Sequence, residues 1–267
     1  MQKGTKPTRP SPLARALAVL DVVAASANAL PPEEIATRAG MSRAGLQAQL
    51  RILLREGLME VSPDGRGYLP GAAAQRLEAL LSQNHSLMAR LQPVLRQLVA
   101  DTGETVTYNA LSHDRRSVMT IAVEYGSAAL QYEVPLGIGK NLVAGASCKS
   151  ILACMGEEAI EEILIEQLPA SRRGGDLERA RLRKELAAIR SRGYALTHGE
   201  RLPGAVGIAA AVFKARHVVC GSLVITIPEL RLRGVKVKSL AEALVTQAAA
   251  LSSRLGADDG ALKGSVA

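Results

Sequence analysis

The first sixty residues alternate between short amphipathic segments and turn residues. Ser11-Pro12 predicts a helix start, because a serine hydroxyl caps free backbone N–H groups and proline suits the first helical position. A second, short helix is expected from Pro31 to Gly40, and Ser42 caps a third helix that ends at Gly57. Apolar residues recur on one face of the first helix at Leu13, Ala16, Leu17, Leu20 and Ala24.

A β-hairpin follows these helices. Residues 58–61 and 68–69 are predicted as short strands, and the turn between them contains Asp64-Gly65, a typical hairpin pair. Helix, short helix, tight turn, helix and hairpin occur here in the order of a winged helix-turn-helix, with the hairpin as the wing. The alternative is a three-helix bundle that packs against another part of the chain.

Residues 72–100 have a helical pattern with a break near 82–86. Pro93 is expected to start or kink a segment of it. A stripe of leucines needs burial, either as a dimer seam or against the domain that follows: Leu77, Leu80, Leu81, Leu87, Leu91, Leu95 and Leu98.

After residue 102 the pattern of hydrophobic residues becomes strand-like, and predicted strands then alternate with predicted helices. Strands are expected at 105–111, 117–123, 130–134, 194–197, 206–213 and 217–227, and helices at 147–154, 157–167, 177–192 and 235–255. This order predicts an α+β domain, an antiparallel sheet with helices on its faces.

Composition narrows the class of protein. Lys and Arg number 33 against 25 Asp and Glu, a net charge of +8 that favours a polyanionic partner. The chain has 5 Tyr, 1 Phe and no Trp, which argues against binding single strands by stacking bases on rings. Three cysteines without a CxxC pair support neither a disulfide framework nor a thiolate zinc site. No apolar run suits a membrane span and no signal peptide is evident, so we expect a cytoplasmic protein with no membrane partner.

These patterns divide the chain into five parts. We expect a disordered arm at 1–11, a winged helix-turn-helix DNA-binding domain at 12–71, linker helices at 72–100, an α+β domain at 101–256, and a flexible tail at 257–267.

Short motifs spread over about 240 residues resemble the IclR (isocitrate lyase regulator) family of bacterial transcription factors. They are 14–20, Ile35-Ala-Thr-Arg-Ala-Gly40, 53–58, 67–69, Pro93-Val-Leu95 with 102–105, Arg192-Gly-Tyr-Ala195 with Glu200, Pro203-Gly204, and 208–213. The resemblance implies a DNA-binding domain joined to a GAF-like effector domain, assembly as a homodimer or tetramer, and regulation by a small molecule. It implies no catalysis and no cofactor.

The chain departs from the family pattern at two places. A Ser-Thr pair followed by Arg, usual in the family's recognition helix, is replaced by Ala44, Gly45 and Ala48. The loop before the first effector-domain helix ends in Cys148-Lys149-Ser150 where Gly-Lys-Ala is usual, with Asn141 in place of a proline just upstream.

The third helix and the wing supply the candidate DNA contacts. Gln47 can bond adenine edges, Arg43 can reach guanine or phosphate, and the small side chain of Ala44 lets the backbone approach or contacts thymine methyls. The full set is Ser42, Arg43, Ala44, Gln47, Arg51, Arg55 and Arg66. Lys3, Lys6 and Arg9 of the arm can add salt-dependent affinity for phosphates.

The candidate effector site centres on a loop of small residues that leads into a helix. Free N–H groups at a helix N-terminus favour a carboxylate, which points to Val143, Gly145, Ala146, Ser147 and Cys148. The resemblance adds the strand positions Ala211, Val224 and Thr226. Arg201 is a candidate partner of an acidic effector, and its alternative is a surface ion pair with Glu200.

The predicted function is a ligand-responsive regulator, a repressor more than an activator, whose affinity for a palindromic operator changes when a small carboxylate or aromatic effector binds. Two rivals stay open: a ligand sensor without sequence-specific DNA binding, and an enzyme that uses Cys148 with one of the histidines His113, His198 or His217. The histidines show no metal-ligand spacing, so no metal site is expected. Cys220 is expected as a buried strand residue, and the basic run 172–192 as a solvated helix face.

Overall fold

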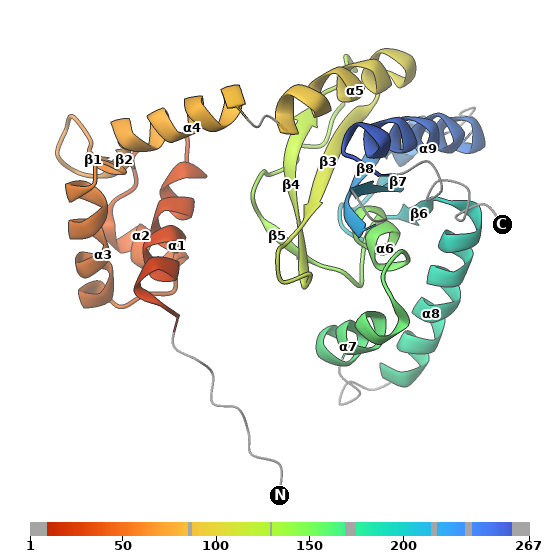
Figure 1. Ribbon diagram of the computed structural model, residues 1–267, viewed down its shortest axis with the longest axis horizontal. Helices are drawn as coiled ribbons and strands as arrows, with labels where there is room; N and C mark the ends of the chain where they lie inside the picture. The colour runs from red at the N-terminus through yellow and green to blue at the C-terminus, as the bar shows by residue number, and fades with distance from the viewer. Residues whose placement is uncertain are drawn as a thin grey trace, which may run out of the picture. The chain divides into compact units, whose positions relative to one another are not determined.

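The computed structural model describes residues 10–84, 87–128, 130–168, 175–214, 218–232 and 237–257. The chain divides into two compact units, Met1–Ser86 and Leu87–Ala267, and each has its own core (Figure 1). This division falls inside the segment 72–100 that the sequence predicts as a linker. Most of the predicted arm and tail, residues 1–9 and 258–267, lie outside the described residues.

The N-terminal unit contains the predicted helices and hairpin. Its elements are α1 (Pro12–Ala24), α2 (Pro32–Arg38), α3 (Arg43–Arg55), β1 (Met59–Val61), β2 (Tyr68–Pro70) and α4 (Ala72–Asn84). The Ser11 hydroxyl accepts a hydrogen bond from the Ala14 N–H (3.1 Å), and the Ser42 hydroxyl accepts one from the Gly45 N–H (3.2 Å). Strands β1 and β2 pair antiparallel around the Asp64-Gly65 turn. Both helix starts and the hairpin agree with the sequence pattern.

The face of α1 that enters the core differs from the expected one. Ala16, Val19 and Val23 are buried, whereas Leu13 and Leu17 are 69% and 50% exposed. The β-branched Val19 and Val23 were not in the predicted stripe, yet they lie one and two turns after Ala16 and share its face. Two large leucines therefore stay on the surface of the described N-terminal unit.

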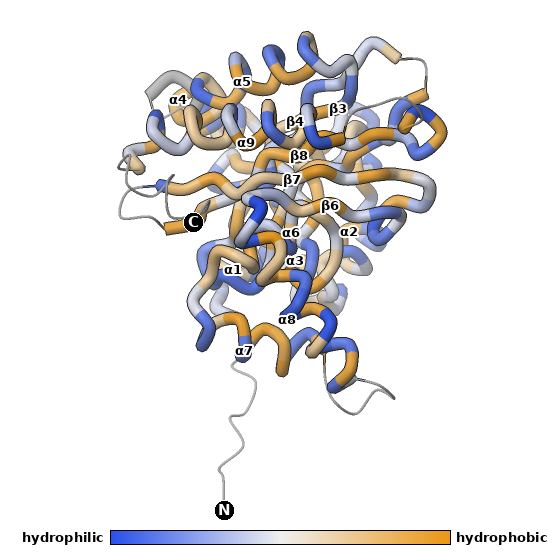
Figure 2. The backbone as a smooth tube through the Cα atoms, turned by 90° about the vertical axis from the view of Figure 1, so that its right-hand side faces the viewer, coloured by the Kyte–Doolittle hydropathy of each residue, from blue (hydrophilic) through white to orange (hydrophobic). Residues whose placement is uncertain are grey.

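The C-terminal unit is a six-stranded antiparallel sheet with helices on both faces. The strand order is β5-β4-β3-β8-β7-β6, with β3 (Thr105–Leu111), β4 (Ser117–Glu124), β5 (Gly139–Asn141), β6 (Ala195–His198), β7 (Ala205–Lys214) and β8 (Val218–Pro228). A 3₁₀ turn, η2 (Glu229–Arg231), follows β8. The tube in Figure 2 is strongly hydrophobic along β7 and β8, which lie inside the sheet.

Each face of the sheet has a separate core. Helices α5 (Leu87–Thr102) and α9 (Val237–Arg254) cover one face, where Tyr108, Ile208 and Leu223 are buried. Helices α6 (Ala146–Leu152), α7 (Glu157–Gln167) and α8 (Gly175–Arg192) belong to the other core. The predicted fold class, an α+β protein with an N-terminal winged helix-turn-helix, a helical linker and a GAF-like antiparallel sheet, is confirmed.

One predicted strand is wrong and one observed strand was not predicted. Residues 130–134 form no strand; Val134 and Pro135 instead line a cavity, and proline has no N–H to donate to a ladder. The edge strand Gly139–Asn141 pairs with β4 although glycine, lysine and asparagine are weak strand formers. The hydrogen bonds of β4 override the local preference there.

The leucine stripe of the predicted linker divides between the two units. Leu91, Leu95 and Leu98 of α5 are buried in the C-terminal unit, and α5 continues through Pro93. Leu77, Leu80 and Leu81 of α4 are 46%, 44% and 62% exposed. Packing on the following domain therefore explains the second half of the stripe, and the first half is left on the surface of the described chain.

Candidate functional site

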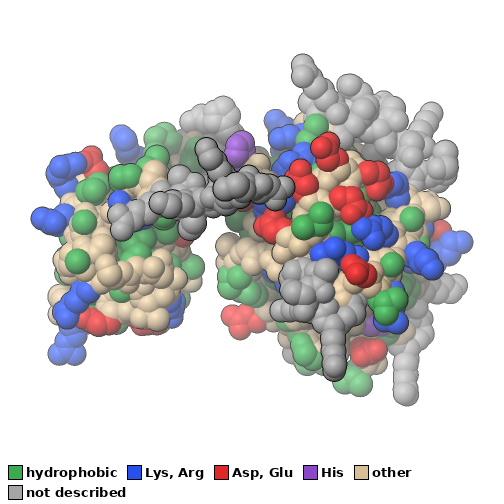
Figure 3. Space-filling model, turned by 90° about the horizontal axis from the view of Figure 1, so that it is seen from below, with side chains coloured by type: hydrophobic (Ala, Val, Ile, Leu, Met, Phe, Trp, Pro, Cys, Tyr) green, Lys and Arg blue, Asp and Glu red, His purple; other side chains and the backbone are tan. Residues whose placement is uncertain are grey.

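The predicted DNA-contacting side chains lie on the surface of the N-terminal unit. Leu46, Leu50 and Leu53 turn α3 into the core, so the opposite face is open. That exposed face carries Ser42, Arg43, Ala44, Gln47, Arg51 and Arg55, and Arg66 is exposed in the hairpin turn. Figure 3 shows Lys and Arg side chains along the edge of this unit where α3 lies.

Few acidic side chains form ion pairs with these arginines. Arg43 is 3.5 Å from Glu33, but the two side chains are 82% and 68% exposed, so the pair contributes little. Arg55 pairs with its neighbour Glu56 at 2.8 Å. Within the described residues, Arg51 and Arg66 have no ion-pair partner. Their guanidinium groups are available to an external anion.

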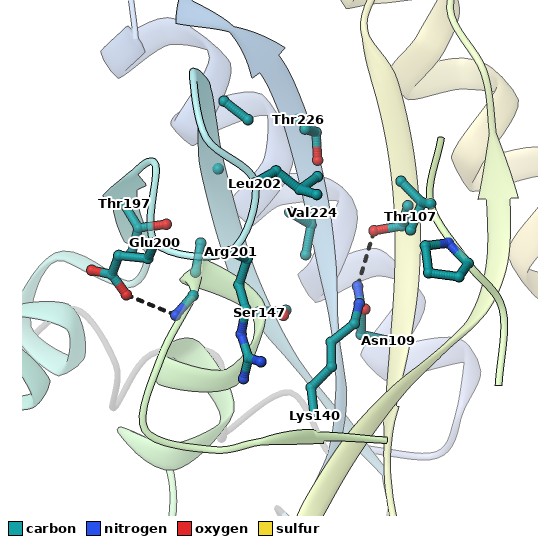
Figure 4. Close-up of a pocket in the computed structure, with 16 residues that line it drawn as sticks. Thr107, Asn109, Lys140, Ser147, Thr197, Glu200, Arg201, Leu202, Val224 and Thr226 are labelled. Carbon is teal, nitrogen blue, oxygen red and sulfur yellow. Dashed lines mark hydrogen bonds between the residues drawn. The ribbon is translucent and has the colours of Figure 1, made fainter. Parts of the chain in front are cut away.

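A cavity of about 270 Å³ opens beside the sheet of the C-terminal unit. Strands β3, β7 and β8, the loop before α6 and the loop between β6 and β7 supply its walls (Figure 4). Six of the predicted effector residues line it: Gly145, Ala146, Ser147, Arg201, Val224 and Thr226. Sequence reasoning missed other lining residues, including Thr107, Asn109, Lys140 and Thr197.

Three predicted effector residues do not line this cavity. Cys148, a residue of α6, is fully buried in the hydrophobic core, and Val143 and Ala211 pack against the same core. Ala211 pairs with Ser222 in the sheet, two residues along β8 from the cavity residue Val224. The three residues therefore belong to the hydrophobic core of this face of the sheet.

The loop before α6 already holds a carboxylate of the protein itself. The Gly145 N–H, expected to face a ligand, donates to Glu200 Oε2 (2.7 Å), as the dashed line in Figure 4 marks. Glu200 Oε1 lies 2.6 Å from Lys149 Nζ, which also binds Glu185 (2.8 Å). The Lys149 side chain is 8% exposed. Two carboxylates thus surround one buried ammonium, and Glu200 brings no free negative charge to the cavity.

Arg201 does not form the ion pair with Glu200 that the sequence left open. Its Nε donates to the carbonyl of Ala144 (3.0 Å) and its Nη2 to the carbonyl of Asn141. Gly145 has φ +84°, and a Cβ there would meet Arg201 Cγ at 2.6 Å. A glycine at 145 is therefore required both by the backbone and by the arginine packed against it.

Lys140 is a second cation in the cavity wall. Its Nζ donates to Thr120 Oγ1 (2.8 Å), and its side chain extends towards Asn109 in Figure 4. Burial, and then the nearby charge of Arg201, lower the pKa of Lys140. No carboxylate among the described residues forms an ion pair with Lys140 or Arg201. A lone lysine between Gly139 and Asn141 gave no sequence signal for this role, because these residues are weak strand formers and Lys140 joins the site only through the pairing of β5 with β4.

The cysteines show no activated nucleophile. Burial raises the pKa of the Cys148 thiol, although Arg201 Nη2, 3.7 Å from its Sγ, partly opposes that effect. Burial likewise raises the pKa of Cys154 to about 11. Cys220 is only half-buried, contrary to the expectation, and its Sγ donates to the carbonyl of Val212. In the part of the chain described, no group of His, Cys, Asp and Glu could hold a metal ion.

Three arginines in the described part of the basic run 172–192 form ion pairs: Arg179, Arg183 and Arg190. Arg183 binds Glu161 (2.7 Å) and Arg190 binds Glu157 (2.9 Å), so α8 is tied to α7. Figure 3 shows acidic and basic side chains interspersed on this unit. Arg172 and Arg173 lie outside the described residues. The surface is thus a mixed-charge helix face and not a uniform basic patch.

An exposed basic helix of a winged helix-turn-helix, followed by a sheet unit with a small cavity lined by polar and apolar side chains, defines a DNA-binding protein with a ligand-binding domain. The chain belongs to the IclR family of bacterial transcriptional regulators: residues 12–63 match the IclR helix-turn-helix domain, and residues 79–253 match the bacterial transcriptional regulator IclR C-terminal domain. The predicted family and the prediction of a DNA-binding transcriptional regulator are confirmed.

Three relatives illustrate the range of the family. The HTH-type transcriptional regulator BhcR of Paracoccus denitrificans is 29% identical over 90% of this chain and 85% of its own. The transcriptional repressor IclR of Escherichia coli is 25% identical over 75% and 74%. A solved IclR homologue from Microbacterium hydrocarbonoxydans, complexed with 4-hydroxybenzoate, superposes with a TM-score of 0.73 over 92% of this chain and 99% of that one, at 23% identity. No helix among the described residues is long and apolar enough to cross a membrane.

Proposed function

We propose that this regulator is a repressor whose affinity for its operator changes when a small organic carboxylate binds in the cavity of the C-terminal unit. The observation that carries the proposal is the pair of cations in the cavity wall, Lys140 and Arg201, which have no carboxylate partner among the described residues. A homologue holds an aromatic carboxylate, 4-hydroxybenzoate, and relatives include repressors.

The charges of the cavity favour an anion. Glu200 is the carboxylate that lines it, and Lys149 and the Gly145 N–H already bind both of its oxygens. Lys140 and Arg201 repel each other, which contributes to the lowered pKa of Lys140. A ligand carboxylate between them would relieve this repulsion and add charge-assisted hydrogen bonds. Val224, Val134 and Leu202 offer apolar surface to the body of the ligand.

The DNA side of the proposal uses the exposed face of α3. Arg43, Gln47 and the small Ala44 stand at its N-terminal part, which enters the major groove in helix-turn-helix proteins. Arg51, Arg55 and Arg66 would contact phosphates, and Ser42 caps the helix that presents them. We place the protein in the cytoplasm, with double-stranded operator DNA as its partner.

The proposal treats the protein as a non-catalytic homo-oligomer. Its relatives are transcriptional regulators, and Cys148 is a buried thiol with a raised pKa, the opposite of what a nucleophile needs. The exposed leucines of α4 supply an apolar surface suited to a second copy of the chain, in a dimer or a tetramer.

Fluorescence anisotropy tests this function directly. The full-length protein is titrated onto the duplex that flanks its own gene and onto a scrambled duplex at about 150 mM salt, where a specific regulator prefers its site by ~10³-fold or more. The titrations are repeated with 4-hydroxybenzoate and with 4-oxopentanoate, and we expect at least one acid to change the affinity for the native duplex only. Equal, salt-sensitive binding to both duplexes would contradict the regulatory function.

A cavity variant connects the response to the site. Lys140→Gln is expected to abolish the effect of the acid while leaving the affinity for DNA without acid unchanged. An acid response that survives both this substitution and Arg201→Gln would place the effector elsewhere and overturn the assignment of the cavity.

A further inference from the structure

A chain of hydrogen bonds crosses three strands beside the cavity. Lys140 Nζ on β5 donates to Thr120 Oγ1 on β4 (2.8 Å), and the Thr120 hydroxyl donates to Asn109 Oδ1 on β3 (2.8 Å). The Asn109 amide then donates to Thr107 Oγ1 (2.9 Å), the contact marked by a dashed line in Figure 4. Thr120, Asn109 and Thr107 are all buried, at 0%, 2% and 3% exposure.

Lys140 sets the direction of this chain. A lysine ammonium has only donors, so Thr120 Oγ1 must accept from it and give its single hydrogen onward. Asn109 therefore presents its carbonyl oxygen to Thr120 and its NH₂ group to Thr107. At the far end, Thr107 Oγ1 receives a hydrogen bond and still has its own hydroxyl hydrogen to donate.

That last hydrogen has no acceptor among the described residues. Thr107 pairs with Val224 across the β3–β8 ladder, and the valine side chain beside it offers no oxygen. Both residues line the cavity. A buried hydroxyl hydrogen without an acceptor is costly, so this hydrogen suits an acceptor that arrives with the ligand.

We propose that Thr107 is a specificity-determining residue, whose hydroxyl donates to an acceptor oxygen, such as a ketone or a second carboxylate, that the effector carries in addition to the carboxylate held by Lys140 and Arg201. The inference rests on the proposed function, because it takes the cavity as the effector site. Asn109 and Thr120 are positioning residues in it, since they act only through the orientation of Thr107.

The chemistry excludes certain ligands. An effector with an alkyl group at this place leaves the Thr107 hydrogen unpaired, and a site built to hydrogen-bond a ligand discriminates strongly against the analogue that lacks the oxygen. Val224, next to it, accepts the apolar body of the ligand. The preferred class is therefore a small keto acid or dicarboxylate with an apolar spacer.

Isothermal titration calorimetry on the full-length protein tests the inference with matched acids. 4-Oxopentanoate is compared with 4-methylpent-4-enoate, and 4-acetylbenzoate with 4-isopropenylbenzoate; in each pair a CH₂ group replaces the ketone oxygen. We expect at least one keto acid to bind about tenfold or more tightly than its methylene analogue. Thr107→Val should reduce that ratio to below about twofold by weakening only the keto acid, and Thr107→Ser should retain it.

The outcomes separate this inference from the proposed function. If keto and methylene acids bind equally and Lys140→Gln weakens both, the proposed function stands and the role of Thr107 is overturned. If a keto preference survives Thr107→Val in a variant with unchanged thermal unfolding, the role of Thr107 is also overturned. If 4-hydroxybenzoate binds and none of the four acids does, only the inference is overturned. If neither 4-hydroxybenzoate nor any of the four acids binds the unmodified protein, the proposed carboxylate response fails and the inference fails with it.

Discussion

Lys149 Nζ and Glu200 Oε1 lie 2.6 Å apart, and the same glutamate accepts the N–H of Gly145 through its other oxygen. One ion pair therefore joins α6, the loop in front of it and the loop between β6 and β7. Since Gly145, Glu200 and the adjacent Arg201 all line the cavity, the pair holds together two of its walls.

Removal of this ammonium should destabilise the C-terminal unit. Lys149→Met leaves Glu185 and Glu200 facing each other, and we expect a loss of about 2 kcal/mol, below the usual range for a broken buried pair because both glutamates are partly exposed. Urea unfolding followed by circular dichroism measures it. The control is Lys238→Met, which breaks an exposed pair with Glu242 and should change stability by less than about 0.5 kcal/mol. Equal effects of the two substitutions would refute the structural role of Lys149.

Gly145→Ala should cost more than an ordinary substitution of a left-handed glycine. At Gly103, where φ is +72° and an added Cβ meets nothing within 4 Å, Ala is expected to cost only the backbone strain of about 1–2 kcal/mol. At Gly145 the Cβ also meets Arg201 Cγ, so a larger loss in thermal stability is expected. In the double variant Gly145→Ala/Arg201→Ala the excess should largely disappear, since the clash is gone. Strict additivity of the two changes would argue against the contact.

The two groups of α3 residues should affect DNA binding differently. Arg43→Ala with Gln47→Ala is expected to lower the preference for the native duplex over the scrambled one, because these side chains are placed to contact bases. Arg51→Ala should weaken binding to both duplexes and reduce the slope of log K against log salt by about one. Anisotropy at several salt concentrations distinguishes the two effects. Arg181→Ala, an exposed arginine of the C-terminal unit, is the control for net charge and should leave specificity unchanged.

Carboxylate binding should weaken as the pH rises. Burial and Arg201 lower the pKa of Lys140 in the free protein, and a bound anion would raise it. Binding is then strongest where Lys140 is already protonated and declines as the pH rises through its lowered pKa, which lies below the ordinary lysine value. Lys140→Arg should bind with a flat profile, because arginine stays charged throughout.

Calorimetry at stepped pH values checks this profile. Cys148→Ser is the control for the one thiol that interacts with both cations. A profile that stays the same in Lys140→Arg would show that another group titrates.

Substitution of the exposed leucines of α4 is expected to change the oligomeric state of the protein. Leu80→Gln with Leu81→Gln should shift the sedimentation coefficient toward that of the monomer, because α4 would lose its apolar face without a change in the core. Leu177→Gln, on the exposed side of α8, is the matched control and should leave the sedimentation unchanged. Sedimentation velocity on the full chain provides the comparison.

The sequence predicts regular elements well where local signals and packing agree. The strand at 105–111 and the helix at 157–167 are observed with the expected bounds, since β-branched residues, glutamates and periodic isoleucines all favour them. The expected strand at 130–134 failed because its apolar residues serve a cavity wall and the surface, which composition alone does not distinguish from a ladder.

The candidate site was harder to predict because its chemistry depends on long-range contacts. The loop 143–148 was found from its small residues, but the carboxylate at its N–H belongs to Glu200, some 55 residues later. Lys140 and Thr107 became part of the site only through the order of strands β5, β4 and β3. No periodicity in the sequence encodes which strand lies next to which.

The walls of the cavity differ in how freely they can be redesigned. Arg201 packs against Gly145 and leaves no room for a side chain there. A substitution at Gly145 therefore disturbs the fold of the loop before it changes which ligand binds. Val224 and Thr226 stand on β8, which is hydrogen-bonded to β3 on one side and β7 on the other. Their side chains can be exchanged while the backbone under them stays in place. A biosensor retuned toward other metabolites should therefore start from this strand, with the loop left untouched.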